Sequence, residues 1–464
     1  MVFNYKYLAL NPALLFILSF VGLVAIGALL LILPFSTTNG ITFIDALFTA
    51  TSAVCITGLV VVDISSGFTI WGQTIILLLQ QSGALGILTF ASYFSFFFKR
   101  GASYETQLAM GSISGTEKMN DVFRTLKRIL IITLLIEFIG AIFIYHSLDA
   151  TMFSSVFDRL FFSAFHSVSA FCNAGFTTLQ NGIMTEGYLY NYSFQLSLVF
   201  LFFLGGLGFP IVINILKYIK HVARRIYLHV VDRKKEVHKP WVLTLGSKIN
   251  LVTTLLLALI GIVFIYVNEY GNTLSAHSGI GKVIAALFSS GVARSSGFNS
   301  INYSQLHVSS ILFIMFMMWV GSSPVSTGGG IKTSTFAIAV LNCLSLVRGK
   351  KKIEVFKREI AEVSIHRAFA TIILSFFAIG IGVLLISVFD NELPLRSIVF
   401  ECVSAYGTVG LSLGITAKLS VAGKLVISSL MFVGRITLLT ILIAFFKQVK
   451  YTSYAYPSEE IIIN

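Results

Sequence analysis

The segment FIDALFTATSAVCITGL at residues 43–59 decides the fold, because variants of it recur three more times along the chain. The recurrences are LFFSAFHSVSAFCNAGF at 160–176, VIAALFSSGVARSSGF at 283–298 and SIVFECVSAYGTVGL at 397–411. Each one is short, contains a glycine just before its last residue and lies between two long apolar runs. Recurrence of one supersecondary unit predicts a chain built from four equivalent pieces.

Alignment on the final glycines supports this repeat. The glycines are Gly58, Gly175, Gly297 and Gly410. In repeats one, two and four, the same residue types stand ten, six and five positions upstream: Phe48, Phe165, Phe400; Ser52, Ser169, Ser404; Ala53, Ala170, Ala405. Repeat three fits less well, because its phenylalanine, Phe288, is nine positions upstream. Because the chain has 37 glycines, the shared offsets carry the prediction, and the glycines alone do not.

The composition indicates that the solvent of this protein is lipid. Of its 464 residues, 56% are hydrophobic and only 11% are charged, and the mean hydropathy is +0.87. A soluble domain has about 25% charged residues. Several apolar runs reach the roughly 20 residues that a helix needs to cross a bilayer.

The recurring segments themselves are too short to cross. A helix of about 10 residues is about 15 Å long, half of the hydrocarbon core. We therefore expect re-entrant helices that enter from outside and turn back around a water-lined path. The predicted fold is an all-α polytopic membrane protein with four M1–P-loop–M2 repeats, that is, eight transmembrane helices and four re-entrant pore helices around a central pore. The predicted repeats are 10–98, 126–220, 248–346 and 366–447, followed by a short cytoplasmic tail at 448–464.

The net charge of +13 is distributed unevenly. The two ends of the chain and the segments 98–128, 217–248 and 341–367 hold 25 of the 33 Lys and Arg residues, and the loops on the other side hold six. This asymmetry predicts a cell-membrane protein with both termini in the cytoplasm. It favours solvated loops over a nucleic-acid surface, with an anionic-lipid patch as the alternative. The four cysteines have neither metal-ligand spacing nor the pattern of a disulfide framework.

The tetrapeptides that end at the four glycines predict a cation filter. They are CITG at 55–58, CNAG at 172–175, RSSG at 294–297 and GTVG at 407–410. Rings of backbone carbonyls replace the hydration shell of potassium, and glycine allows the backbone to present them. None of the four contains Asp or Glu, but four converging helix C-termini would attract a cation. The alternative is that the glycines are ordinary helix C-caps. The predicted potassium-binding residues are Val54, Cys55, Ile56, Thr57, Gly58, Phe171, Cys172, Asn173, Ala174, Gly175, Ala293, Arg294, Ser295, Ser296, Gly297, Tyr406, Gly407, Thr408, Val409 and Gly410.

With these repeats, the chain resembles the Trk/Ktr/HKT potassium transporters over essentially its whole length, and the Ktr-type membrane subunits most of all. Further marks of the resemblance are QSGALGILTF at 81–90, FLGGLGFPIVINI at 203–215, MWVGSSPVSTGGGIKTSTF at 318–336 and FVGRITLLT at 432–440. One departure is Ala84, where relatives usually have a second glycine.

The resemblance implies potassium uptake across the cytoplasmic membrane, gated by an intramembrane loop that matches residues 321–332. Glycine at position 58 fits the potassium-permeating class. The implied gate residues are Gly321, Ser326, Thr327, Gly328, Gly329, Gly330, Lys332 and Arg435. The resemblance also implies a homodimer on a cytosolic ring of nucleotide-binding regulatory subunits (KtrA-like), with nucleotide acting only through that partner. Sodium stimulation stays open, and the alternative is a Trk- or HKT-type symporter that carries sodium or protons with potassium.

Two of these gate residues, Lys332 and Arg435, are positively charged. A charge at mid-helix costs about 2.5–3.5 kcal/mol, so Arg435 in the apolar stretch 426–446 needs a partner or a watery pore. An interhelical salt bridge is its alternative role, and simple solvation is the alternative for Lys332. Arg294 either braces the filter or is solvated at the outer mouth, and His166 is expected to pack or to hydrogen-bond. Three consecutive glycines at 328–330 disfavour a helix and suit a gate. GGGIKTS is not a phosphate-binding loop, and no residue cluster suggests an enzyme.

Overall fold

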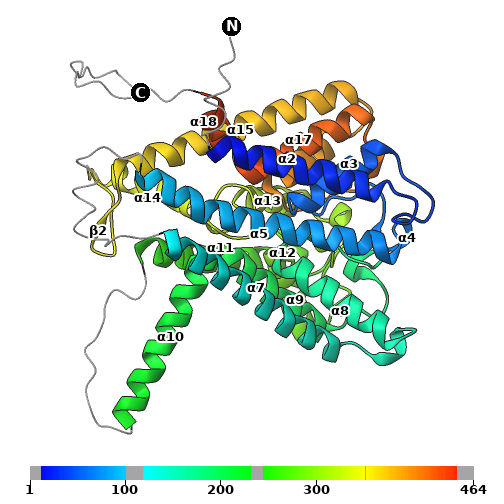
Figure 1. The fold of residues 1–464 in the computed structure, drawn as a ribbon, viewed down its shortest axis with the longest axis horizontal. Coiled ribbons are helices and arrows are strands. Elements are labelled where there is room, and N and C mark those ends of the chain that lie inside the picture. The colour runs from blue at the N-terminus through cyan, green and yellow to red at the C-terminus, as the bar shows by residue number, and fades with distance from the viewer. Residues whose placement is uncertain (1–11, 101–118, 231–243, 351, 447–464) are drawn as a thin grey trace.

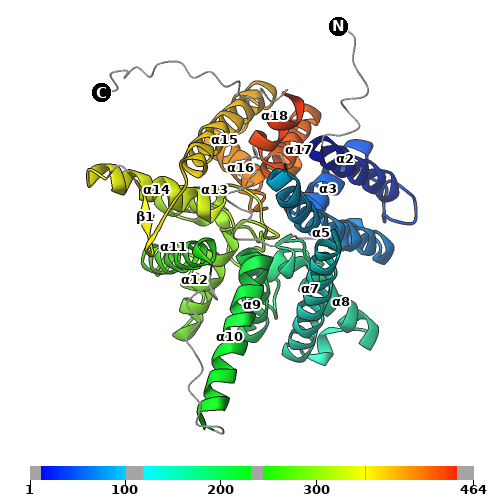
Figure 2. The same cartoon turned by 60° about the vertical axis from the view of Figure 1, so that its left-hand side comes forward.

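The computed structural model describes residues 12–100, 119–230, 244–350 and 352–446. The predicted tail at 448–464 and part of the basic segments lie outside these residues. The described chain forms four groups of helices that follow one another in sequence order around a central region (Figure 2). The groups are α2 (Pro12–Leu31), α3 (Phe43–Val54), α4 (Ile64–Gly67), α5 (Ile70–Arg100); α7 (Met119–Ser147), α8 (Val156–Phe171), α9 (Tyr192–Leu207), α10 (Phe209–Val230); α11 (Leu245–Glu269), α12 (Ile280–Val292), α13 (Val308–Trp319), α14 (Thr333–Val347); and α15 (Glu362–Phe389), α16 (Leu395–Gly407), α17 (Val421–Ile436), α18 (Leu438–Phe445).

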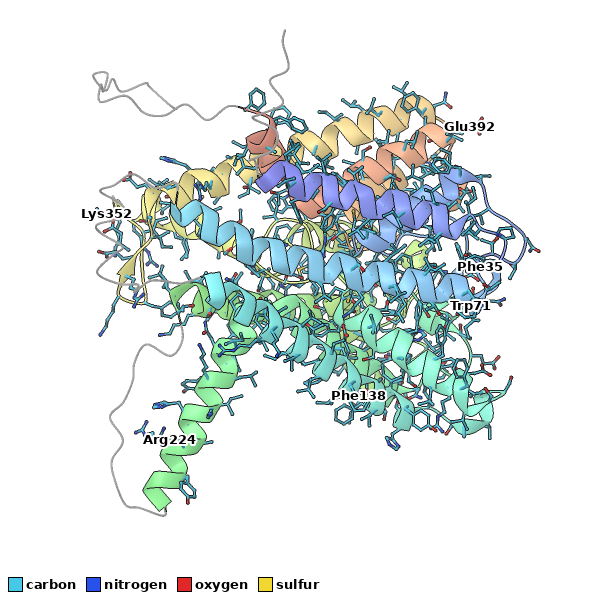
Figure 3. The ribbon with its side chains drawn as sticks, viewed as in Figure 1. Phe35, Trp71, Phe138, Arg224, Lys352 and Glu392 are labelled. Carbon is cyan, nitrogen blue, oxygen red and sulfur yellow. The ribbon has the colours of Figure 1, made fainter. Side chains whose placement is uncertain are left out.

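The long helices present apolar side chains to the outside. Among the described residues, α2, α7, α11 and α15 are long and apolar enough to cross a membrane unbroken. Together with α5 they run roughly along the long axis of the molecule (Figure 1). Phe138, at the middle of α7, exposes 66% of its surface on the flank of the bundle (Figure 3). Such a continuous apolar surface is costly in water and favourable against lipid tails.

In the second, third and fourth groups, the long helix that follows the short helix is broken in two. The sequence predicted such a break only in the third group, between α13 and α14. The chain turns by 104° between α9 and α10 and by 84° between α17 and α18. The first break is at Gly208, which has a φ of 82°, and Pro210 then lacks the N–H needed to continue the helix. The second is at Thr437, with a φ of 70°.

The four short helices α3, α8, α12 and α16 have 12, 16, 13 and 13 residues. At 1.5 Å per residue they are about 18–24 Å long, slightly longer than expected but still too short to cross the bilayer. Two of them begin at polar caps, because the side chains of Thr42 and Ser155 accept the backbone N–H of Asp45 and Asp158. Three short 3₁₀ turns follow the glycine repeats, at Gly182–Met184, Tyr303–Gln305 and Thr416–Lys418.

A small hairpin departs from the all-α prediction. Strand β1 (Glu354–Val355) pairs antiparallel with β2 (Arg358–Glu359). The two residues between them, Phe356 and Lys357, have φ values of 51° and 62°, as a type I′ turn requires. The hairpin lies at the end of the molecule that carries Lys352 (Figure 3). It therefore adds a small structure to a basic loop and leaves the helical architecture unchanged.

An ion pair joins the first group of helices to the last. Lys424 Nζ on α17 donates to Asp45 Oδ1 on α3 at 2.7 Å, across 379 residues of sequence, and the two side chains are only 15% and 14% exposed. Asp45 Oδ2 also accepts the hydroxyl of the cap residue Thr42 at 2.7 Å. The pair thus fixes the start of one short helix against the fourth group.

We expect Asp45→Asn to lower the half-unfolding temperature of the detergent-purified protein by about 2–4 °C, because it leaves the Lys424 ammonium without its counter-charge. Lys352→Met is the matched control. It removes an ion pair with Glu359 of 2.9 Å in which both side chains are about half exposed, and such pairs contribute little. Equal shifts in the two variants would contradict a role for Asp45 in holding the groups together.

Candidate functional site

The glycines that end the four repeats meet in a closed ring. All four have positive φ, of 90° at Gly58, 70° at Gly175, 68° at Gly297 and 92° at Gly410. A Cβ on each glycine would overlap the carbonyl oxygen that precedes the next glycine in the ring. Those oxygens belong in turn to Ala174, Ser296, Val409 and Thr57. The last contact returns to the first repeat, so four backbone segments surround one point.

We call the four segments 55–58, 172–175, 294–297 and 407–410 glycine turns one to four. The residue two positions before each glycine also has a positive φ, of 57° at Ile56, 58° at Asn173, 145° at Ser295 and 48° at Thr408. Such conformations are unfavourable outside glycine and persist only where the surroundings hold them. All 20 predicted potassium-binding residues are buried here.

The ends of the turns explain why repeat three aligned poorly. The N–H before the glycine donates to a carbonyl five residues back in turns one, two and four: Thr57 to Ser52 at 2.8 Å, Ala174 to Ser169 at 2.8 Å and Val409 to Ser404 at 2.9 Å. In turn three, Ser296 donates to Val292, only four residues back, at 3.1 Å. Turn three is therefore one residue tighter, which places Phe288 nine positions upstream of its glycine.

The aligned serines brace the turns. Ser52 Oγ accepts the N–H of Gly58 at 3.1 Å, and Ser404 Oγ accepts that of Gly410 at 3.1 Å. Ser169 instead donates to the carbonyl of Phe176 at 2.7 Å. Their recurrence in the sequence thus reflects hydrogen bonds that hold the ring. In the same part of α8, His166 is buried and bonded to Phe162 O and Thr177 Oγ1, both at 2.9 Å, as predicted.

A cavity of about 320 Å³ lies on the side of the ring toward which the chain continues after each glycine. All four glycines line it, together with Asp63 and the residues that follow the other turns. The buried carboxylate of Glu401 supports this wall, because it accepts the hydroxyls of Thr416 and, at 2.8 Å, of Ser412. The glycine ring is thus the floor of a polar vestibule.

The segment 320–332 between α13 and α14, the intramembrane loop, packs against the opposite side of the ring. A Cβ on Gly328 would overlap Ser295 Oγ of turn three, and one on Gly329 would overlap Thr408 of turn four. Thr327 Oγ1 donates to the carbonyl of Phe171, just before turn two, at 3.1 Å. The sequence predicts that the glycine run at 328–330 is flexible. The structure gives a second reason for glycine at 328 and 329, because no larger residue fits this close to the turns.

Three backbone hydrogen bonds tie the intramembrane loop to the break between α9 and α10. Ser323 N donates to Gly206 O at 3.0 Å, Thr327 N to Gly205 O at 3.3 Å and Phe209 N to Val325 O at 3.1 Å. Helix α10 leaves the bundle from this point (Figure 1). A displacement of α10 would therefore act directly on the loop beneath the ring.

Both positively charged side chains predicted for the gate bind this loop. Lys332 Nζ donates to Gly328 O at 2.6 Å, and Arg435, which is only 3% exposed, donates to Thr327 O and, at 3.5 Å, to Gly83 O. Within the described parts of the chain, neither has a carboxylate at ion-pair distance. The described residues therefore speak against the salt-bridge alternative for Arg435, and Lys332 is bonded to the loop rather than simply solvated.

Arg294 is not at the outer mouth, where the sequence analysis placed it. The side chain is 6% exposed and donates to Thr254 O on α11 at 3.2 Å and to Gly321 O at 3.4 Å. Gly321 is part of the intramembrane loop, so Arg294 lies on the loop side of the ring. It braces turn three against two neighbouring elements, and the solvated alternative is wrong.

Sequence reasoning missed the buried carboxylates near the ring. Glu137 on α7 accepts a hydrogen bond from Gln81 on α5 at 3.1 Å, and Glu401 supports the vestibule. Neither residue belongs to a tetrapeptide that ends at one of the four glycines. The signal that could have found Glu137 is a single acid within the apolar run IITLLIEFIGAIF at 131–143, because an ionisable residue inside a span is rarely placed there without a function.

Comparison with known proteins identifies relatives of this chain. The family model of the TrkH cation transport proteins matches residues 16–454. The Ktr system potassium uptake proteins B and D of Bacillus subtilis are 32% and 34% identical to this chain, each over 458 residues that cover 98% of it and 97% and 98% of their own lengths. The potassium/sodium uptake protein NtpJ of Enterococcus hirae is 32% identical over 98% of this chain and 97% of its own.

A solved structure shows the same fold. The potassium transporter TrkH from Vibrio parahaemolyticus superposes with a TM-score of 0.69 over 94% of this chain and 84% of its own, at 17% identity. The predicted all-α membrane fold and the resemblance to Trk and Ktr proteins are thereby confirmed, as is the assignment to transporters rather than enzymes. The chain belongs to the TrkH family of cation transport proteins.

Proposed function

We propose that this chain takes up potassium across the cytoplasmic membrane, with the glycine ring as its selectivity filter. The observation that carries the proposal is the closed ring of four glycines with positive φ, each against the carbonyl that precedes the next. Carbonyl oxygens around one axis replace the hydration shell of potassium without any carboxylate. The Bacillus subtilis relatives are named potassium uptake proteins B and D, and these names support the same cation.

The surroundings of the ring suit a cation in transit. The hydroxyls of Thr57, Ser295, Ser296 and Thr408 are buried and have no hydrogen-bond partner among the described residues. Unpaired polar oxygens are costly in a dry interior and favourable beside ions or water. The helices α3, α8, α12 and α16 also end at the turns, so their C-terminal dipoles favour positive charge there.

The intramembrane loop is the gate of this proposal, and Lys332 and Arg435 hold it beneath the filter. The three hydrogen bonds to the α9–α10 break support control from the cytoplasmic side. Arg224 and Lys352 lie at the end of the bundle opposite to Phe35, Trp71 and Glu392 (Figure 3). With the basic asymmetry of the sequence, this favours a cytoplasmic location for that end and for both termini. The names of two relatives place those proteins in a Ktr system, which supports a further, regulatory subunit as a partner of this chain. The homodimer and the nucleotide-binding ring are part of this proposal through the family resemblance alone.

A second candidate is a symporter in which sodium accompanies potassium. The relative from Enterococcus hirae, named a potassium/sodium uptake protein, favours this alternative. Both candidates use the same filter, so they differ in whether uptake of potassium requires or moves sodium.

Rubidium uptake into proteoliposomes tests the proposed function. Tracer rubidium is measured with potassium, sodium or caesium as the competitor, and with sodium gradients of either direction. Block by potassium but not by sodium supports the potassium filter, and rubidium uptake driven by a sodium gradient supports the symporter. Equal block by potassium and sodium would overturn potassium selectivity.

Gly58→Ser should reduce the preference for potassium over sodium by about tenfold, a change of roughly 1.4 kcal/mol in relative binding. Its Cβ would displace the Ala174 carbonyl from the ring, and serine is strained at a φ of 90°. The measurement is the ratio of the sodium and potassium concentrations that halve rubidium uptake. Gly40→Ser is the control, because Gly40 has a φ of 74° and open space around it. An unchanged ratio in Gly58→Ser would exclude turn one from the filter.

Deletion of Ser326–Gly330 should raise rubidium uptake by about tenfold, because losing roughly 1.4 kcal/mol of loop contacts shifts a two-state gate by that factor. Initial rates are compared at equal protein content in proteoliposomes. Gly380→Ala on α15, with open space around its Cβ position, is the control for a change elsewhere in the bundle. A folded deletion variant with unchanged or lower uptake would show that the loop is structural.

A further inference from the structure

Glu137 is a carboxylate buried beside glycine turn two. It lies near the middle of α7, exposes 5% of its surface and belongs to a span that is otherwise apolar. Within the described residues, no Lys, Arg or His is at ion-pair distance from it. A charged or unpaired side chain at this depth costs several kcal/mol, so the position of Glu137 needs an explanation in its contacts.

Those contacts lead to the filter through two side chains. Gln81 Nε2 on α5 donates to Glu137 Oε2 at 3.1 Å. The thiol of Cys172 lies 3.4 Å from Gln81 Oε1 and 3.8 Å from Glu137 Oε1, so either oxygen can accept its S–H. Cys172 is fully buried and is the first residue of turn two. Helices α5 and α7 therefore both contact turn two through the side chain of Cys172.

The backbone at Glu137 is held in place by the short helix that leads to the turn. Ser167 Oγ on α8 donates to the backbone carbonyl of Glu137 at 2.6 Å. A Cβ on Gly140, one turn further along α7, would also overlap the region of this hydroxyl, at 2.6 Å. The two helices are thus in close contact, and the position of Glu137 relative to turn two is fixed on both sides.

The intramembrane loop holds the other side of the same turn. Thr327 donates to Phe171 O at 3.1 Å, and its hydroxyl lies 2.7 Å from the side-chain amide of Asn173. Turn two is therefore clamped between Thr327 and the group formed by Glu137, Gln81 and Cys172. If the loop withdraws when the pore opens, turn two loses its contact with Thr327 and keeps the contact with Glu137, Gln81 and Cys172. Arg294 occupies the same position in turn three and reaches α11 in a similar way.

We propose that Glu137 is a positioning residue for the filter. Acting through Gln81 and Cys172, it keeps turn two in the geometry that discriminates potassium from sodium while the intramembrane loop is displaced. The inference rests on the proposed function, because it assigns a determinant of selectivity to that same ring.

The experiment measures the same ratio, of the sodium concentration to the potassium concentration that halves rubidium uptake, in four variants of the full chain. Glu137→Leu removes the acceptor, Cys172→Ala removes the thiol, Cys172→Ser keeps a donor, and the fourth variant combines Glu137→Leu with Cys172→Ala. We expect each of the first two to lower the ratio about threefold to tenfold, the factor for one lost hydrogen bond. Cys172→Ser should lower the ratio less than Cys172→Ala does, and the double variant should be no worse than the poorer single one.

Glu269→Gln is the matched control, because Glu269 is a buried carboxylate whose partners are Asn272, Thr273 and the His307 N–H, away from the filter. It should lower thermal stability without changing the ratio, so a general loss of stability cannot imitate the expected result. If Glu137→Leu does not fold, Cys172→Ala decides the question, because it removes one buried atom.

The outcomes separate the two proposals. A wild type that prefers potassium, with unchanged ratios in folded Glu137→Leu and in Cys172→Ala, overturns the positioning role and leaves the proposed function standing. Additive effects in the double variant also overturn it, because residues of one chain of contacts do not act independently. A wild type without preference for potassium overturns the proposed function itself.

Discussion

The close approach of four backbone segments at Gly58, Gly175, Gly297 and Gly410 is the constraint on which the rest of the structure depends. No side chain fits at any of these positions, because the space beyond each Cα is filled by the carbonyl before the next glycine. Four short helices must therefore end at one depth, and the helices around them must hold strained backbone in place. The bracing serines, the Asp45–Lys424 pair and the buried Arg294 all contribute to this.

The repeat could be predicted from the sequence because its signals are local. Ser52 and Ser404 recur at a fixed offset because each accepts the N–H of the glycine six residues later. The segment between serine and glycine therefore has the same length in both repeats. The poorer alignment of Phe288 also has a local cause, the tighter closure of turn three. Most of the architecture and the composition of the ring follow from such short-range patterns.

The remaining features depend on contacts that local patterns do not contain. The direction of Arg294 is set by carbonyls 27 and 40 residues away, and Glu137 meets Gln81 across 56 residues. The break at Thr437 has no glycine to mark it, since a β-branched residue there adopts a φ of 70° under tertiary constraint. Local sequence patterns can mark such residues, but they do not indicate which distant residues they contact.

The ring of glycine turns belongs to one covalent chain, and its quarters are not identical. Turn three is one residue tighter than the others and carries an arginine where turns one and two carry cysteines. In a pore built from four identical subunits, every substitution changes all four positions at once. Here a change in one codon alters one of the four turns, and the other three preserve the geometry of the ring. Ion preference can therefore change in small steps, by evolution or by engineering.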